Sequence, residues 1–185
     1  MPFLDYARKR LRAFLEEVDN LAEDEFPYRA SKDLLDELSK LFRLKLTRLE
    51  SLGPKSDPDT VKHACGLALG ALFDYLPLLG FVRRSTNVRN AFEVFGPLLR
   101  LARDVLEPSV PKPDRKARLV LSSEWDYSPF IYPDVPELPG FVLIGLPAPE
   151  SSNPLLVPLA GHELGHSLWS KLDSQGSWNR KSTKG

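Results

Sequence analysis

The fold class is decided by one short stretch, PGFVLIGLP at residues 139–147. Its apolar run from Phe141 to Leu146 is bounded by proline and glycine and is too short for a buried helix, so it predicts a buried strand. A second run, Arg118-Leu-Val-Leu121, predicts a further short strand. The sheet is therefore small, and it lies in the second half of the chain.

Helical periodicity fills the sequence before the strands. Apolar residues recur every three or four positions over 3–24 and again over 31–49, so each segment predicts an amphipathic helix. Ser31 is the predicted N-cap of the second of these helices. A fourth helix is expected over 87–106, with its inner side chains spaced in the same way and a kink at Gly96-Pro97.

The third predicted helix carries the most apolar run of the chain, residues 64–82. Asp57 and Pro58 supply an N-cap and a first-turn proline for its start. The run is long enough to be considered as a membrane span, but it contains Asp74, and a central Asp costs about 2.5–3.5 kcal/mol on insertion scales. We therefore expect a buried helix of a soluble protein and no membrane segment.

Together these patterns predict an α+β fold that is mainly helical, in which N-terminal helices are followed by a small sheet and a last helix ending near Leu172. The expected organisation is a helical region over 1–110, a segment with the sheet and the last helix over 111–173, and a polar tail over 174–185. Pro158 falls near the start of the last helix, so a tighter turn is expected just before it.

The composition narrows the class of function. The 185 residues include 25 Lys+Arg and 25 Asp+Glu, and 42% are hydrophobic, which is typical of a globular domain. Zero net charge argues against a nucleic-acid partner, because phosphate binding requires a basic surplus. The single cysteine cannot form an internal disulfide and the N-terminus lacks a signal-peptide pattern, so a cytoplasmic location is expected.

The last helix carries the motif with the most definite chemistry, His162-Glu163-Leu164-Gly165-His166. Residues four apart lie on one side of a helix about 5–6 Å apart, so His162 and His166 can offer imidazole nitrogens to one Zn²⁺ ion. Glu163 lies one residue step around the helix, where it can accept a proton from a zinc-activated water. The predicted roles are therefore metal ligation for the two histidines and general base for Glu163.

The stretch from Pro154 to Trp169, with this motif inside it, resembles the active-site helix of the zincin metallopeptidases. The strand Phe141–Leu146 resembles the edge strand that lines their cleft. The resemblance spans about residues 117–172 and implies a small sheet over two helices, a catalytic Zn²⁺ and hydrolysis of peptide bonds. It also implies that a substrate peptide pairs beside strand 141–146.

The third zinc ligand does not carry over from this family. Its metzincin branch needs Gly and His three and six residues beyond the second histidine, where this chain has Trp169 and Leu172. Its thermolysin-like branch needs a later Glu, but the 19 residues after His166 contain no Glu and no His. Three explanations stay open: the chain is a fragment or truncated form of a larger protein, the ligand lies upstream, such as Glu150 or Asp126, or the site is a non-catalytic remnant.

Two weaker candidates for a site have structural interpretations. His63 and Cys65 lie two positions apart on a helix and so point to different sides, which favours a buried histidine and an inert core cysteine. The aromatic residues between Trp125 and Tyr132 could line a substrate pocket, but packing against the sheet is favoured.

We therefore expect a zinc-dependent hydrolase, specifically a metallopeptidase, with Zn²⁺ as its cofactor and a peptide or protein as its substrate. The N-terminal helices are expected to recruit substrates or a protein partner. The alternative is a non-catalytic helical interaction protein with a degenerate zincin-like end. Stoichiometric zinc in the purified protein would favour the enzyme, and its absence would favour the interaction protein.

Overall fold

The computed structural model describes residues 2–85, 93–106, 118–124, 129–132, 137–138, 140–150 and 152–166. By its internal contacts the chain divides into two units, Met1–Thr86 and Asn87–Gly185, which we call the helical unit and the sheet unit. Long helices make up the first, and a small mixed sheet with helices makes up the second. The predicted class, α+β and mainly helical, is confirmed.

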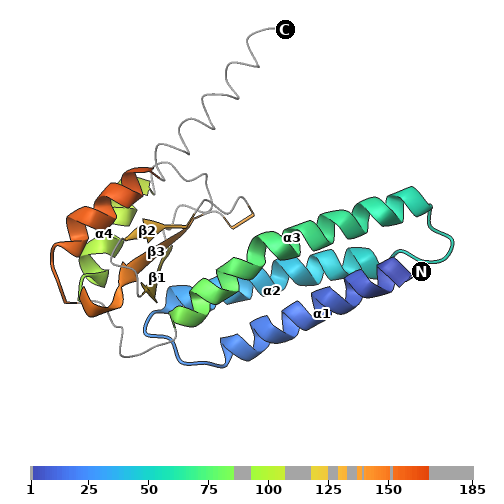
Figure 1. Cartoon of the computed structure of the whole chain (residues 1–185), viewed down its shortest axis with the longest axis horizontal. Coiled ribbons are helices and arrows are strands. Elements are labelled where there is room, and N and C mark those ends of the chain that lie inside the picture. The colour runs from blue at the N-terminus through green and yellow to red at the C-terminus, as the bar shows by residue number, and fades with distance from the viewer. Residues whose placement is uncertain are drawn as a thin grey trace, which may run out of the picture. The chain divides into compact units, whose positions relative to one another are not determined.

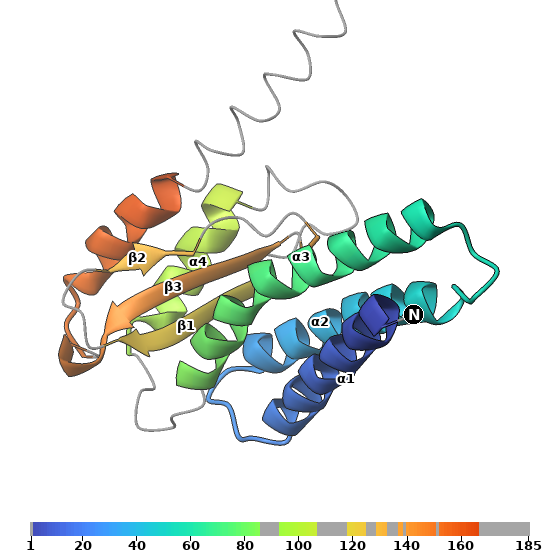
Figure 2. The same ribbon diagram turned by 45° about the vertical axis from the view of Figure 1, so that its right-hand side comes forward.

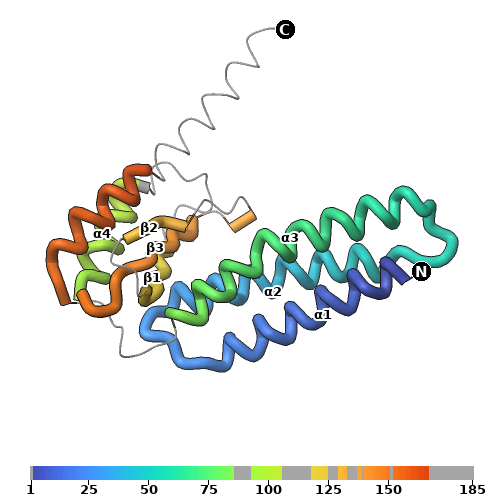
Figure 3. The backbone as a smooth tube through the Cα atoms, viewed as in Figure 1, coloured from blue at the N-terminus to red at the C-terminus, as the bar shows by residue number. Residues whose placement is uncertain are grey.

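The helical unit consists of α1 (Pro2–Ala22), α2 (Arg29–Glu50) and α3 (Pro58–Arg84), which run alongside one another (Figures 1 and 3). Each helix buries one apolar side, as the spacing of its residues predicts. At the centre of this core the ring of Phe42 lies 4.3 Å from that of Phe14 and 5.6 Å, edge-on, from that of Tyr75. One aromatic cluster thus joins all three helices.

The N-cap of α3 is the predicted one. The Asp57 carboxylate accepts hydrogen bonds from the backbone N–H and the hydroxyl of Thr60, both at 2.8 Å, and Pro58 occupies the first turn. These hydrogen bonds, the backbone one first, hold the pKa of Asp57 below its ordinary value. Charge at this position therefore supports the helix start.

The predicted N-cap of α2 is wrong. The helix begins at Arg29, with Tyr28 as an N-cap residue that makes no side-chain cap bond. Ser31 lies inside the first turn, is buried, and its hydroxyl pairs at 3.1 Å with that of Ser85 at the end of α3. The Ser31 hydroxyl, which the sequence assigned to capping, therefore makes a tertiary hydrogen bond instead.

Arg8 ties two helices together. Although its position on α1 predicts a solvated side chain, its guanidinium donates to the Leu49 carbonyl at 2.9 Å and to the Leu52 carbonyl at 2.7 Å. These carbonyls belong to the end of α2 and the residues after it, where backbone acceptors run short of helical donors, and the Leu49 carbonyl also accepts the Leu52 N–H at 3.2 Å. Arg8 thus caps α2 from a neighbouring helix.

Helix α3 buries one side against its neighbours and leaves the other open. Phe73 and Leu67 are exposed, whereas Leu72 and Leu78 are buried. By length and composition the helix is apolar enough to cross a membrane, and 44% of its most apolar window is buried within the protein. A core helix has the same properties, so the expected soluble state stays a prediction.

The sheet unit contains β1 (Arg118–Glu124), β2 (Phe130–Ile131) and β3 (Phe141–Pro147). Figure 2 shows β3 between the other two strands; β1 pairs with it in parallel, and β2 pairs with it antiparallel. Gly140 enters β3 with a φ of 83°, which favours glycine, as its place after Pro139 predicts. The prediction that Phe141–Leu146 is an edge strand is wrong, because β3 is central.

One face of the sheet packs against two helices, α4 (Phe95–Leu106) and a helix over residues 156–166. The shared core contains alternate residues from β1 and β3, as a two-residue strand period requires. Its members from the strands are Leu119, Leu121, Val142, Ile144 and Leu146, and those from the helices are Leu98, Ala102, Leu156, Ala160 and Leu164.

Helix α4 differs from its prediction in two respects. It begins at Phe95, so Gly96 and Pro97 lie in its first turn, where proline is tolerated, instead of forming a kink. It also belongs by its contacts to the sheet unit, whose boundary with the helical unit lies at Thr86, whereas the sequence placed the boundary near residue 110. The predicted part of this helix over 87–92, and the polar tail, lie outside the described residues.

Candidate metal centre

The 156–166 helix is fixed at its start by a small polar network. The Asn153 side chain accepts from the Leu155 N–H at 3.0 Å and donates to the Glu150 carboxylate at 2.7 Å. Pro158 is the third helical residue, where the missing N–H would have no helical partner in any case. Asn153 therefore caps the turn over residues 154–155 that leads into the helix, in the place where the sequence predicts a tighter turn.

Burial divides this helix into two sides. Leu156, Ala160 and Leu164 are buried in the core of the sheet unit, as predicted from their spacing. His162 and His166 are exposed, and Glu163 lies half-buried between the two sides. The motif thus presents its histidines to solvent on a helix whose opposite side is anchored.

The two glycines of the motif region have different surroundings. A Cβ on Gly161 would lie 3.1 Å from the Leu101 side chain of α4, so this glycine lets the two helices approach closely, as a glycine inside a helix predicts. A Cβ on Gly165 would meet nothing within 4 Å. The second glycine therefore leaves open space beside the histidines.

The two histidines converge on one point. Their Nε2 atoms lie 3.1 Å apart, and their rings meet edge to face with centroids 4.6 Å apart. A tetrahedral Zn²⁺ with nitrogen ligands at about 2.0–2.1 Å requires two such nitrogens about 3.3 Å apart. The separation in the structure thus differs from the coordinating one by only a few tenths of an ångström.

Glu163 completes a compact group of donors. Its carboxylate and the ring nitrogens of His162 and His166 all lie within 4.8 Å of one another. Two imidazoles and a carboxylate are a donor set that suits zinc. The residues that the sequence singled out are therefore brought together, and their types and spacing fit the ion.

A third ligand separate from Glu163 is not found among the described residues, where these three residues are the only such group. Glu150, proposed from the sequence as an upstream ligand, bonds to Asn153 instead. Asp126, the other upstream candidate, lies outside the described residues. The described part of the chain thus provides two imidazoles, with Glu163 beside them.

Sequence reasoning missed two apolar residues on the histidine side of the helix. Leu155 and Leu159 are 65% and 51% exposed. Together with His162 and His166 they follow a spacing of four, three and four, which places all four residues along one side. That spacing was readable in the sequence, but the solvent exposure of the leucines required the structure.

The weaker candidates have structural roles. His63 is exposed, contrary to the expectation of a buried histidine, whereas Cys65 is buried as predicted. Burial raises the pKa of the Cys65 thiol, and the charge of Arg8 opposes that effect only in part, so the thiol is inert. The ring of Phe130 packs over Gly145 on β3, as the packing interpretation of the aromatic segment predicts, and Trp125 lies outside the described residues.

Comparison of the chain with protein families, with curated proteins and with solved structures gives no match.

Proposed function

We propose that this protein is a zinc-dependent hydrolase, specifically a metallopeptidase, whose metal is held by His162 and His166. The observation that carries the proposal is the convergence of the two Nε2 atoms, 3.1 Å apart, on the exposed side of an anchored helix. Zn²⁺ bound there would polarise a substrate carbonyl and make water a stronger nucleophile near neutral pH.

The residues of the helix have separate tasks in this proposal. His162 and His166 bind the metal through Nε2, and the core contacts of Leu156, Ala160 and Leu164 hold them in register. Glu163 accepts a proton from the attacking water at a carboxylate oxygen and passes it to the leaving amine. Glu163 is half-buried, and its carboxylate lies within 4.8 Å of the ring nitrogens of both histidines.

The substrate in this proposal is a peptide or protein segment. Leu155 and Leu159 offer an exposed apolar surface next to the histidines, on which an apolar side chain of the substrate can lie. On the side of β3 away from β1, β2 pairs only with Ile144 and Gly145. A substrate backbone can therefore pair with an outer edge of the sheet, on β1 or β2, or with the part of β3 that β2 does not cover.

The decisive experiment measures zinc binding and peptidase activity on the same preparations of the whole chain. We expect the wild type to bind one Zn²⁺ per chain by titration calorimetry and the His162→Ala/His166→Ala variant to lose that binding. His63→Ala is the matched control, because His63 is the remaining histidine, is exposed, and lies on α3.

The Glu163→Gln variant separates metal binding from catalysis. It should bind zinc as the wild type does, while hydrolysis of an unfolded protein substrate falls by about 10²–10⁴-fold, the usual contribution of a general base. Hydrolysis at the wild-type rate by this variant would contradict the role of Glu163. Equal zinc binding by the wild type and the double histidine variant would contradict the metal site itself.

The rival function is a non-catalytic interaction protein. It is favoured by the observation that the described residues offer no third ligand apart from Glu163, since catalytic zinc usually has three protein ligands. A wild-type protein that binds no zinc, or that binds zinc without hydrolysing any peptide, would support the rival over the enzyme.

A further inference from the structure

The helical unit contains a groove that the metal centre does not use. It lies between the last turns of α1 and the second half of α3 and has a volume of about 420 Å³. We call it the α1–α3 groove. Its lining residues are Glu17, Asn20, Leu21 and Asp24 from the α1 side and Leu76, Leu79, Gly80 and Arg83 from α3.

The middle of the groove is apolar and partly open. Leu76 is 40% exposed, and Leu79 is half-buried. Gly80 has no side chain to fill the space, and a Cβ there would meet only the Arg84 guanidinium, at 3.5 Å. An apolar side chain from outside can therefore enter and gain contact with several leucine atoms.

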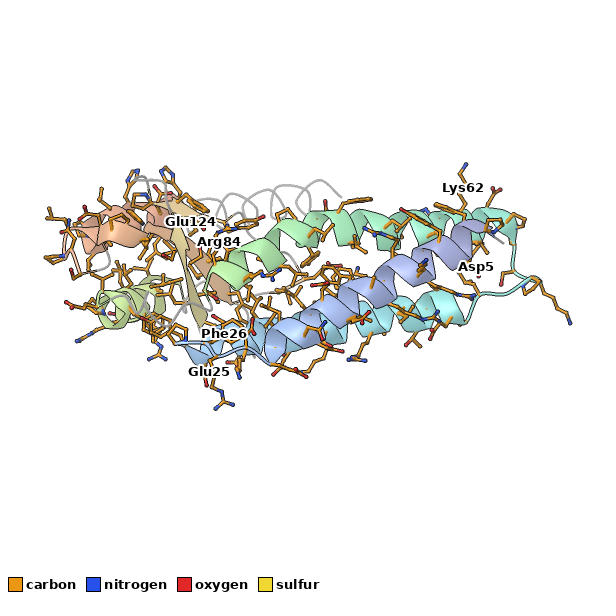
Figure 4. The ribbon with its side chains drawn as sticks, turned by 60° about the horizontal axis from the view of Figure 1, so that its bottom comes forward. Asp5, Glu25, Phe26, Lys62, Arg84 and Glu124 are labelled. Atoms are coloured by element: carbon orange, nitrogen blue, oxygen red, sulfur yellow. The ribbon has the colours of Figure 1, made fainter. Side chains whose placement is uncertain are left out.

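The α1 side of the groove is acidic. Glu17 and Asp24 lie seven positions apart, about two helical turns of sequence, and neither is in an ion pair among the described residues. The chain from residue 13 to residue 28 contains six acidic residues and no Lys or Arg. Figure 4 shows Glu25, from this acidic stretch, and Arg84 at the same end of the bundle.

The α1 side of the groove has no basic residue of its own to pair with these carboxylates. The last turn of α1 contains no basic residue, and no Lys or Arg occurs between residues 13 and 28. The charges of Glu17 and Asp24 are therefore not neutralised from within their own segment.

The acidic residues also do not form a site for a single metal ion. Among the described residues, Glu17 and Asp24 do not gather with a third carboxylate, histidine or cysteine as the residues of the metal centre do. Their charges are spread along the groove instead, with Arg83 on the opposite wall. An occupant that complements the groove therefore carries positive charge on the side that faces Glu17 and Asp24, and apolar side chains beside it.

We propose that the α1–α3 groove binds a basic amphipathic helix of a protein partner. Apolar side chains of that helix at i, i+3 or i+4, and i+7 enter over Leu21, Leu76 and Leu79. Its Lys or Arg residues lie along the α1 wall and pair with Glu17 and Asp24. This proposal is independent of the metal centre.

The test uses the whole chain and a synthetic 18-residue helix of Leu and Lys, with Leu at helical spacing, and a scrambled peptide of the same composition. Binding is measured by fluorescence anisotropy of the labelled peptide. The Glu17→Gln/Asp24→Asn variant removes the acidic wall. Its matched control, Asp36→Asn/Asp104→Asn, removes two exposed acidic residues outside the groove and changes the net charge equally.

We expect the amphipathic peptide to bind the wild type and the control variant alike, and the groove variant at least about tenfold more weakly. Leu76→Ser, at an exposed position that leaves the core intact, should also weaken binding. Equal binding by the groove variant and the control, equal binding of the scrambled peptide, or no binding at about 1 mM peptide would overturn the proposal.

Discussion

Polar side chains serve different purposes in the two units. In the helical unit the Arg8 guanidinium bonds to carbonyls of residues 41 and 44 positions away, and so joins two elements. In the sheet unit His162 and His166 are exposed, and their rings contact each other. The first arrangement stabilises the fold, whereas the second adds nothing to packing. That difference is the physical reason for assigning chemistry to the histidines.

The largest effect on stability should come from the sheet. Gly145→Ala places a Cβ against the ring of Phe130, and overpacking of this kind costs about 1–3 kcal/mol. Gly165→Ala is the matched control in the same unit, since it meets open space in a helix and should instead stabilise by about 0.5–1 kcal/mol. Urea unfolding of both variants measures the contrast. Two changes of the same sign would contradict the close contact of Phe130 with β3.

The next effect concerns Arg8. Arg8→Met removes the side-chain donor to the Leu52 carbonyl and leaves the Leu49 carbonyl with only the Leu52 N–H, and it should cost about 1–2 kcal/mol of unfolding free energy. Lys9→Met, at an exposed neighbouring position, should stay within about 0.5 kcal/mol of the wild type. If both variants unfolded at the same urea concentration, Arg8 would not be a structural cap. The polar side chains of the helical unit would then stabilise the fold no more than the histidines of the sheet unit do.

A smaller effect depends on pH. Because the pKa of Asp57 in the folded state is lowered from its ordinary value of 3.8, its contribution to stability is complete above that value and is lost as the pH falls through the folded-state pKa. Asp57→Asn keeps a cap acceptor without the charge, so acid should narrow the difference in Tm between wild type and variant. Thermal scans at about pH 7 and about pH 2.5 test this. A difference in Tm between wild type and Asp57→Asn that grew at the lower pH would contradict a stabilising charge on Asp57.

The smallest effect should be that of the histidines on the metal-free fold. His162→Ala leaves the core residues Leu156, Ala160 and Leu164 in place, so the metal-free variant should unfold within about 0.5 kcal/mol of the wild type. Added Zn²⁺ should then stabilise only the wild type, because a ligand stabilises the state that binds it. A large loss of stability without zinc would make the histidine pair a structural element and weaken the proposed function.

The sequence predicted features that depend on local spacing. The cap at Asp57, the buried side of the 156–166 helix and the convergence of its histidines all follow from residues within a few positions of each other. Helical periodicity also placed α1 and α3 close to their observed bounds. These features needed no knowledge of distant contacts.

The sequence did not predict features that depend on residues far apart in the chain. Strand β3 was expected at an edge from its resemblance to the zincin edge strand, and β2, which pairs on its other side, has only two residues, too few for a recognisable pattern. Ser31 was expected to cap a helix, but its partner Ser85 lies 54 positions away. The α1–α3 groove likewise depends on two helices that no local pattern brings together. In each case the missing information was a tertiary neighbour.

The central position of β3 also affects the order in which the parts of the chain fold. Its longest pairing joins it to β1, with residues 125–140 between them, so the sheet must close that loop before its core can form. Because α1, α2 and α3 precede the sheet in the sequence, they can pack during synthesis while the sheet is still being made. His162 and His166 follow the three described strands, so both nitrogens become available to a metal only after these strands have been synthesised.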